Sequence, residues 1–374
     1  MLKRIHEELP AKLKEVGIRF YIPEKIAVRQ LKKLRKRIYA RIDADGIVLV
    51  SGKGKRKTPI QRLSEWIDQC LAKLKQYTKD IHICGNRNSF SKTDHDATFM
   101  HMKEDYMRNG QLKPGYNVNV ATCSDFIIGS YISSDRNDVH TLIPFMEQLR
   151  KNYAGRNIGS VVVDSGYESE ENYCWFEAHP ETELYVKPSN HEAVKHRKYR
   201  TDISRRENMA YDAQTDTYTC ANGKLLQRTQ EKKTHTASGL EIATSVYECN
   251  ECDGCPLKEK CIRACGSKKP LEERYKVIYV SKRFARQRQA MEAKISSPKG
   301  CLLRVNRSIQ AEGNFAYVKQ DLDFRRFLLR GNMKVAAEWL LFSLALNILH
   351  LHHKIQNRRL GSDLKIPSSF PAGL

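Results

Sequence analysis

The chain has 374 residues, and its 65 Lys and Arg residues against 43 Asp and Glu residues give a net charge of +22. Hydrophobic residues make up 40%, enough for a packed core, and the length suits two or three domains. A basic excess of this size predicts a polyanionic partner, for which nucleic acid fits best. We find no signal peptide, lipidation signal or amphipathic membrane helix, and the most apolar stretch, residues 339–349, is too short to span a bilayer.

The beginning of the chain is predicted to be helical and very basic. Leu31, Leu34 and Ile38 repeat at helical spacing within a run of Lys and Arg residues. Such a run is either a solvated helix face or a surface that contacts phosphates. Residues 51–59 contain nothing apolar to bury and predict a basic loop, and a second amphipathic helix starts at Ile60.

The next part of the chain predicts a mixed α/β sheet. An alternating stretch and an apolar stretch, separated by a short polar break, indicate an antiparallel hairpin. Strands and helices then alternate, as in right-handed crossover units. The predicted elements are strands at 116–122, 126–132, 161–163 and 184–186, a helix from 138 to 149 and a helix from 168 to 177.

Asp164 directly follows Val161, Val162 and Val163, a run that is typical of a strand buried on both faces. This places the carboxylate at the C-terminal end of a central strand, where sites collect in open α/β sheets. A charge in that position must be solvated, paired or bound to metal. The simpler interpretation is a turn residue that caps the following helix.

Residues 191–305 differ in kind, being polar and basic, and we interpret them as an insertion domain. Closely spaced thiols in a chain without a secretion signal favour tetrahedral zinc over disulfides. Free thiols and an iron–sulfur cluster are the alternatives, although the last spacing departs from the ferredoxin pattern. Cys265 is a spare thiol. We expect four of five cysteines to bind one zinc ion: Cys220, Cys249, Cys252, Cys255 and Cys261.

Helical spacing returns after the insertion. Ile309, Glu312, Phe315 and Lys319 fall on one helix face. The last helix, residues 332–353, is apolar nearly all round, which predicts that it is buried and packs across the sheet.

Several of these stretches resemble motifs of bacterial insertion-sequence transposases of the DDE superfamily. Residues 161–173, Val-Val-Val-Asp-Ser-Gly-Tyr-Glu-Ser-Glu-Glu-Asn-Tyr, are similar to the motif of the second catalytic Asp. Residues 311–319, Ala-Glu-Gly-Asn-Phe-Ala-Tyr-Val-Lys, with the basic stretch 324–331, resemble the Glu motif. Residues 91–98 and 112–117 are similar to the segment leading into the second strand of the family.

The resemblance implies a ribonuclease-H-like mixed sheet, metal-dependent DNA cleavage and strand transfer. By carry-over, Asp164 and Glu312 are ligands of Mg²⁺ or Mn²⁺, and Lys319 contacts the DNA backbone. Arg307 is a weaker DNA-contact candidate, because it lies five residues before Glu312 where many relatives have Arg four before. The basic stretch adds Arg325 and Arg326 as candidate DNA contacts.

One catalytic residue of the family has no clear counterpart. The first Asp of the family lies on a strand upstream of a long helical segment, and here that helical segment begins at Met1. We therefore expect the chain to lack the first catalytic strand and to bind DNA without transposing it. The alternative is that Asp94, Asp96 or Asp45 replaces the missing carboxylate.

The predicted protein is a cytoplasmic, nucleoid-associated DDE transposase, homodimeric on insertion-sequence ends and target DNA and without a membrane partner. The alternatives are a non-catalytic basic DNA-binding protein on the same scaffold and a structure-specific nuclease that cuts without joining. The predicted segments are a basic helical segment (1–84), the first part of the catalytic domain (85–190), the Cys-rich insertion (191–305), the second part of the catalytic domain (306–358) and a tail (359–374).

Overall fold

The computed structural model describes residues 1–102, 108–263, 269–361 and 364, and it divides into two compact units. The first unit is Met1–His95 and the second is Asp96–Leu374. Cys265 and most of the predicted tail lie outside the described residues. Each unit has its own hydrophobic core, so each is described by itself.

The first unit is made of three helices. They are α1 (Leu2–Glu15), α2 (Val28–Ala44) and α3 (Pro59–Cys84). The single helical stretch expected up to about residue 45 is broken in two, because the chain leaves α1 at Gly17 with a positive φ of 70°. The helix predicted from Ile60 is confirmed, with Thr58 as its N-cap and Pro59 in its first turn.

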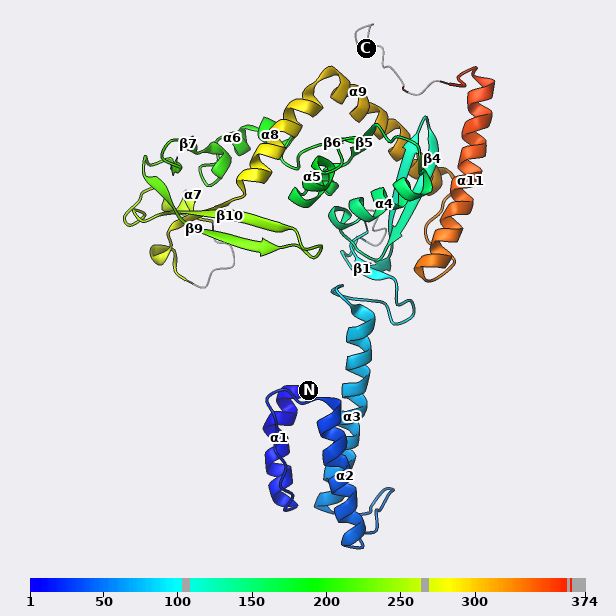
Figure 1. The fold of residues 1–374 in the computed structure, drawn as a ribbon. Helices are drawn as coiled ribbons and strands as arrows, with labels where there is room; N and C mark the ends of the chain where they lie inside the picture. Colours follow the sequence, from blue (N-terminus) through cyan, green and yellow to red (C-terminus); the bar gives the residue numbers. More distant parts are fainter. Residues whose placement is uncertain (103–107, 264–268, 362–363, 365–374) are drawn as a thin grey trace. The chain divides into compact units, whose positions relative to one another are not determined.

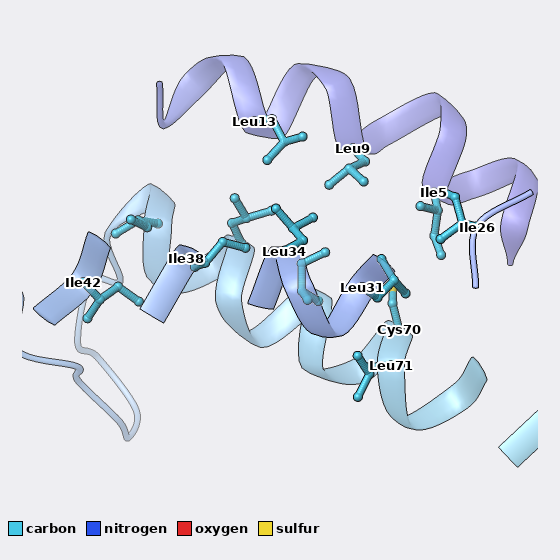
Figure 2. Close-up of a cluster of buried hydrophobic side chains, with 13 residues drawn as sticks. Ile5, Leu9, Leu13, Ile26, Leu31, Leu34, Ile38, Ile42, Cys70 and Leu71 are labelled. Carbon is cyan, nitrogen blue, oxygen red and sulfur yellow. The ribbon is translucent and has the colours of Figure 1, made fainter. Parts of the chain in front are cut away.

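The core of this unit is an apolar seam between the three helices (Figure 2). Leu31, Leu34 and Ile38 of α2 are completely buried, as the 3-4 spacing predicted. The seam uses the inner face of α2, which leaves the Lys and Arg residues of this helix on the outside. The buried residues are Ile5, Leu9, Leu13, Ile26, Leu31, Leu34, Ile38, Ile42, Ile60, Leu63, Ile67, Cys70 and Leu71.

The second unit contains the predicted hairpin and the predicted crossover. Strands β3 (Asn117–Cys123) and β4 (Phe126–Ser133) pair antiparallel, with Ser124 and Asp125 in the left-handed region between them. Strands β5 (Ser160–Val163) and β6 (Glu183–Val186) pair parallel. Between the two pairs runs α4 (Leu142–Asn152), and α5 (Glu170–Glu177) connects β5 to β6.

The prediction of one mixed sheet is wrong for the described residues. The two strand pairs form two separate sheets, because no described strand joins β3 to β5. The valines of β5 are consequently half-buried, where burial on both faces was expected. The mixed α/β class is confirmed, and a short additional sheet is formed by β1 (Thr98–Met100) and β2 (Lys113–Gly115).

The largest sheet lies in the region predicted as an insertion. It is a five-stranded antiparallel sheet in the order β11-β10-β9-β8-β7. Its long ribbon of β9 and β10 is visible in Figure 1. The strands are β7 (Ala210–Asp212), β8 (Thr217–Thr219), β9 (Leu225–His235), β10 (Glu241–Cys249) and β11 (Lys276–Val280), with the short helices α6 (Arg197–Arg200) and α7 (Lys258–Cys261) beside them.

The chain returns from this sheet to the strand pairs through helices. First, α8 (Lys282–Ser296) packs against β6 and α5, and α9 (Pro298–Arg307) then packs against β5. The helical path continues through a π-helical turn (Ser308–Glu312), α10 (Gly313–Ala316) and a second π-helical turn (Tyr317–Asp321).

The last helix, α11 (Asn332–Gln356), packs along β4 (Figure 1). Trp339 and Leu346 are buried against Ile127 of that strand, and Val335 is fully buried. The expectation that this helix is buried all round is wrong, because one whole side of it is exposed. It is also longer than the apolar stretch read from the sequence, and by length and composition alone its 25 residues would suffice to cross a membrane.

Candidate active site

The turn after β5 places Asp164 at the end of the strand, as predicted. The Asp164 carboxylate is exposed, and its Oδ1 accepts a hydrogen bond from the Ser165 amide at 2.7 Å. Asp164 thus caps the short turn Ser165–Tyr167 with one carboxylate oxygen, whereas the helix that it was expected to cap in the simpler interpretation, α5, is capped by Ser169. The second oxygen points to no hydrogen-bond donor among the residues described, so the carboxylate keeps a free ligand position.

A second carboxylate, Asp138, lies beside this turn and was not among the predicted site residues. The turn Asp138–His140 packs against the turn Ser165–Tyr167. A Cβ atom on Gly166 would lie 3.0 Å from Asp138 Oδ2, so the missing side chain of Gly166 makes room for this carboxylate. Asn117 donates to the other oxygen of Asp138 at 2.7 Å.

A buried polar network ties this turn to strand β3. Tyr167 donates its hydroxyl hydrogen to Asn119 Oδ1 at 2.5 Å, and Thr141 donates to the same oxygen at 2.8 Å. Burial raises the pKa of Tyr167, and the charges of Asp138 and Asp164 raise it further, against smaller opposing effects of the Thr141 hydroxyl and the Arg307 charge. Tyr167 therefore stays protonated and acts as a donor that fixes the position of the Asp164 turn.

Glu312 ends the first π-helical turn, and two neighbours hold its carboxylate. Arg307 donates to Oε1 at 2.7 Å and Ser308 donates to Oε2 at 3.0 Å. A π-helical turn contains one more residue than an α-helical turn, so residues five apart share a face. This explains why Arg307 can lie five residues before Glu312, where many relatives have Arg four residues before. The π-helical turn accommodates the additional residue and leaves Arg307 and Glu312 on the same face of the helix.

The opposite side of this turn is anchored to the β3–β4 hairpin. Gln310 and Asn314, each two residues from Glu312, are buried and bond to the backbone of Asp125 at 3.4 and 3.5 Å. The π-helical turn also packs against β3, while α9 packs against β5. The turn that carries Glu312 therefore contacts β3, and the helix before it contacts β5, the strand that Asp164 follows. The meeting of the two carboxylates stays a prediction.

The other predicted residues are distributed as follows. Lys319 is exposed beside the Phe315 ring, and Arg325 pairs with Asp323 while Arg326 is exposed. Among the alternatives for a third carboxylate, Asp45 pairs with Arg41 and Asp96 accepts from the Asn332 amide at the start of α11. Asp45 and Asp94 belong to the first unit, and Asp96 to the second.

The predicted zinc cysteines gather at one end of the five-stranded sheet. Cys249, Cys252 and Cys261 are buried, whereas Cys220 and Cys255 are half-buried. Burial raises the pKa of Cys249 to about 11, and the neighbouring thiols Cys252 and Cys220 add to this shift. Burial likewise raises the pKa of Cys261, with contributions from Cys220, Cys252 and Cys255. The five thiols are thus electrostatic neighbours.

The structure nevertheless presents no finished metal site. Within the part of the chain that it describes, no group of three or more His, Cys, Asp or Glu side chains is arranged to hold a metal ion. The donor types fit the expected metals, since carboxylate oxygens suit Mg²⁺ and thiolates suit zinc. In the described residues, however, these carboxylate and thiol groups do not converge on a common point.

Comparison with protein families finds a match for part of the chain. Residues 219–352 match a family model described as a transposase DDE domain. This match confirms the resemblance to DDE-superfamily transposases and supports a transposase-type function; transposases of this superfamily act on DNA and generally use a divalent metal such as Mg²⁺. It includes Glu312, Lys319 and the five cysteines, and it leaves Asp164 outside. Searches of curated proteins and of solved structures give no match.

A buried ion pair holds the Asp164 turn against α8 and provides a test of this packing. Arg288 donates two hydrogen bonds of 2.8 Å to Glu168, and the Ser189 amide donates a third at 2.7 Å. Burial would raise the pKa of Glu168, but the guanidinium and the amide outweigh it and the pKa is lowered. The Glu168 side chain is only 1% exposed and that of Arg288 is 23% exposed, so removal of the Glu168 charge leaves the largely buried Arg288 guanidinium without its ionic partner.

We predict that Glu168→Gln destabilises the second unit by roughly 3 kcal/mol at neutral pH, the scale for breaking a buried ion pair. Because the folded-state pKa of Glu168 is lowered, its contribution is complete above the ordinary carboxyl pKa of about 4.3 and is lost as the pH falls below it. Thermal melts from pH 7 down to pH 3 should show the difference from the native chain shrinking. The exposed Glu147→Gln is the control, and an equal effect there would contradict the assignment.

Proposed function

We propose that this protein is a metal-dependent DDE transposase of insertion-sequence ends, working in the bacterial cytoplasm at the nucleoid. The observation that carries the proposal is the packing of the Glu312 turn on β3 and of α9 on β5, the strand that ends in Asp164. The match to a transposase DDE domain supports the same interpretation of the Glu312 motif.

Asp164 and Glu312 are the proposed metal ligands, and Lys319, Arg307, Arg325 and Arg326 are the proposed DNA contacts. A bound Mg²⁺ or Mn²⁺ ion supplies activation of the attacking hydroxyl and charge stabilisation at the phosphodiester. Arg307 donates to one oxygen of Glu312, so an ion bound by Glu312 would compete with this pair and would leave the guanidinium free to contact the DNA backbone. Tyr167, held by Asn119, keeps the Asp164 turn in place during this exchange.

The second candidate function is DNA binding without catalysis. The Arg307–Glu312 ion pair favours it, because the carboxylate already has a cationic partner. A site that joins DNA needs charge compensation on both the attacking and the leaving oxygen, which two carboxylates alone supply poorly. We therefore propose that this protein, although built as a DDE transposase, binds DNA and does not join it.

A strand-transfer assay with Mg²⁺ or Mn²⁺ tests this choice on DNA that carries the element's own ends. We predict that no joining occurs. In a separate measurement by titration calorimetry, we expect the native chain to bind Mn²⁺ weakly. Asp164→Asn and Glu312→Gln should each abolish this Mn²⁺ binding. Joining that disappears in Asp138→Asn would place the third carboxylate at Asp138 and contradict our view of this chain. Joining lost only in Asp45→Asn, Asp94→Asn or Asp96→Asn would place it there instead. Mn²⁺ binding unchanged in both ligand variants would overturn the site itself.

The outer face of α2 is the proposed surface for the DNA backbone. Four of its seven exposed basic residues lie opposite the buried seam, spaced at about one helical turn. Basic residues elsewhere on the surface are often neutralised by carboxylates, as Arg35 is by Asp68. The four residues of the α2 basic face are Arg29, Lys32, Lys33 and Lys36.

We predict that replacing the α2 basic face by Gln lowers the log–log slope of DNA affinity against salt by about 3 to 4, because each phosphate that a basic side chain neutralises adds about 0.9 to this slope. Fluorescence anisotropy with a random-sequence duplex over a salt series measures it. The matched control removes the same charge from Lys residues that pair with carboxylates, and an equal change there would show that only net charge matters. These control residues are Lys195, Lys224, Lys233 and Lys299.

Structural zinc in the cysteine cluster is a separate proposal, supported by the crowding of the five thiols. Zinc would draw the thiolates to one point and would stabilise a module whose small core includes Cys249 and Cys252. We predict zinc in protein purified without chelator, and its loss in Cys252→Ser but not in the control Cys301→Ser. Chelation should unfold the five-stranded sheet and spare the core around α4. Absence of zinc with all five thiols freely reactive would refute the proposal.

A further inference from the structure

The outer side of α11 carries a row of large exposed apolar side chains. Most of the large side chains on this side are at least half exposed, although the helix is apolar along its whole length. Monomeric proteins rarely expose a contiguous apolar patch of more than a few hundred Å², and larger patches mark interaction sites. The exposed residues are Met333 (85%), Leu340 (59%), Leu341 (70%), Leu344 (59%), Ile348 (61%), Leu351 (43%) and Ile355 (54%).

The exposure is a fixed property of the helix, because its inner side is tightly anchored. Asn347 exchanges two hydrogen bonds of 2.8 Å with the backbone of Ile127 on β4. Glu338 accepts from the amides of Leu328 and Leu329, and Trp339 is buried. These hydrogen bonds set the rotation of the helix about its axis, so the outer side cannot turn inward without breaking them.

The exposed residues repeat in a pattern that suits packing against another helix. Leu341, Leu344, Ile348, Leu351 and Ile355 follow one another at steps of three, four, three and four residues. This is the a and d spacing of a coiled-coil seam, in which one helix packs its knobs into the holes of a like helix. Such a seam is self-complementary, as a twofold interface requires.

Charge also favours a second copy of the same chain as the partner. A chain with a net charge of +22 repels its copies over most of its surface. From Val335 to Gln356 the only Lys, Arg, Asp or Glu residues are Glu338 and Lys354, and both are buried. Two copies can therefore approach along this side without placing like charges opposite each other.

The available area is sufficient for a stable pair. Seven large apolar side chains at these exposures offer on the order of 700 Å² per copy, close to the ~800 Å² that each partner of a standard interface buries. We propose that α11 is a homodimerisation helix, and that two copies pair through the seam Leu341–Leu344–Ile348–Leu351–Ile355 without DNA or metal. This proposal goes beyond the proposed function and does not depend on it.

Sedimentation velocity of the full chain, without DNA and with reductant, tests the proposal. We expect a species of twice the 43.2 kDa chain mass. The double variant Leu344→Glu/Ile348→Glu should halve this mass and keep the native circular dichroism and melting temperature, because both side chains are more than half exposed. The matched control is Val48→Glu/Leu328→Glu, which changes the charge equally at side chains that are 81% and 82% exposed and should remain dimeric.

Three results would overturn the proposal: a native chain that sediments as a monomer at all concentrations, a Leu344→Glu/Ile348→Glu variant that remains a dimer, or a control that dissociates as readily. A monomeric native chain that pellets with neutral phosphatidylcholine vesicles would assign the apolar side to a lipid surface. Because no assay component is DNA or metal, a failure here leaves the proposed catalytic site untouched, and the reverse also holds.

Discussion

Helix α4 is the common support on which the larger unit depends. Its residues Leu142, Phe145, Met146 and Leu149 form one buried cluster with side chains from both strand pairs and from α8. The β3–β4 and β5–β6 sheets share no ladder, so this apolar packing, rather than backbone hydrogen bonding, holds them in one body. Hydrophobic packing is non-directional, and it fixes proximity better than orientation.

Orientation comes from a small number of buried polar interactions. Asn119 accepts hydrogen bonds from Tyr167 and Thr141, and so links β3 to the Asp164 turn and to the start of α4. Gln310 and Asn314 perform the same role between the Glu312 turn and the hairpin. Buried polar groups must find partners, so such hydrogen bonds specify geometry that apolar packing leaves loose. The candidate site is built at the exposed ends of these two polar networks.

Local patterns in the sequence were sufficient for most of the elements. The valine run before Asp164 predicts β5, and the spacing of Leu31, Leu34 and Ile38 predicts the buried side of α2, because both depend on nearest neighbours along the chain. The separation of the two sheets could not be predicted in this way, since strand pairing depends on residues far apart. The exposed side of α11 could not be predicted for the same reason. An apolar sequence indicates that a helix is stabilised by burial, but it does not show whether the same chain supplies the residues that bury each side.

The site shows the same division. Asp164 and Glu312 were recognisable from motifs, whereas Asp138 was seen only as the beginning of a helix. Its approach to Gly166 follows from the packing of two turns that are 25 or more residues apart. The π-helical turn was also unpredictable, because a change from i+4 to i+5 hydrogen bonding leaves no clear mark on the apolar pattern. The spacing of Arg307 was its one visible trace.

The Arg307–Glu312 ion pair determines whether Glu312 is available to bind a metal ion. Arg307 neutralises a carboxylate that the proposed chemistry needs for metal, and Ser308 occupies its second oxygen. Exchange of the guanidinium for a divalent ion costs little electrostatic energy, because the Glu312 side chain is 62% exposed and such exposed pairs are weak. Binding of DNA phosphates by the released arginine would couple the loading of metal to the presence of substrate.

The central claim is that Asp164 and Glu312 bind one metal ion together. The most direct test is to load the protein with Fe²⁺ in place of Mg²⁺ and to map the backbone cuts that ascorbate and peroxide produce around the bound iron. We expect two clusters of cuts, one near residue 164 and one near residue 312, both suppressed by excess Mg²⁺ and both lost in Asp164→Asn. Cuts near only one of these residues, or a Glu312 cluster that persists in Asp164→Asn, would contradict it.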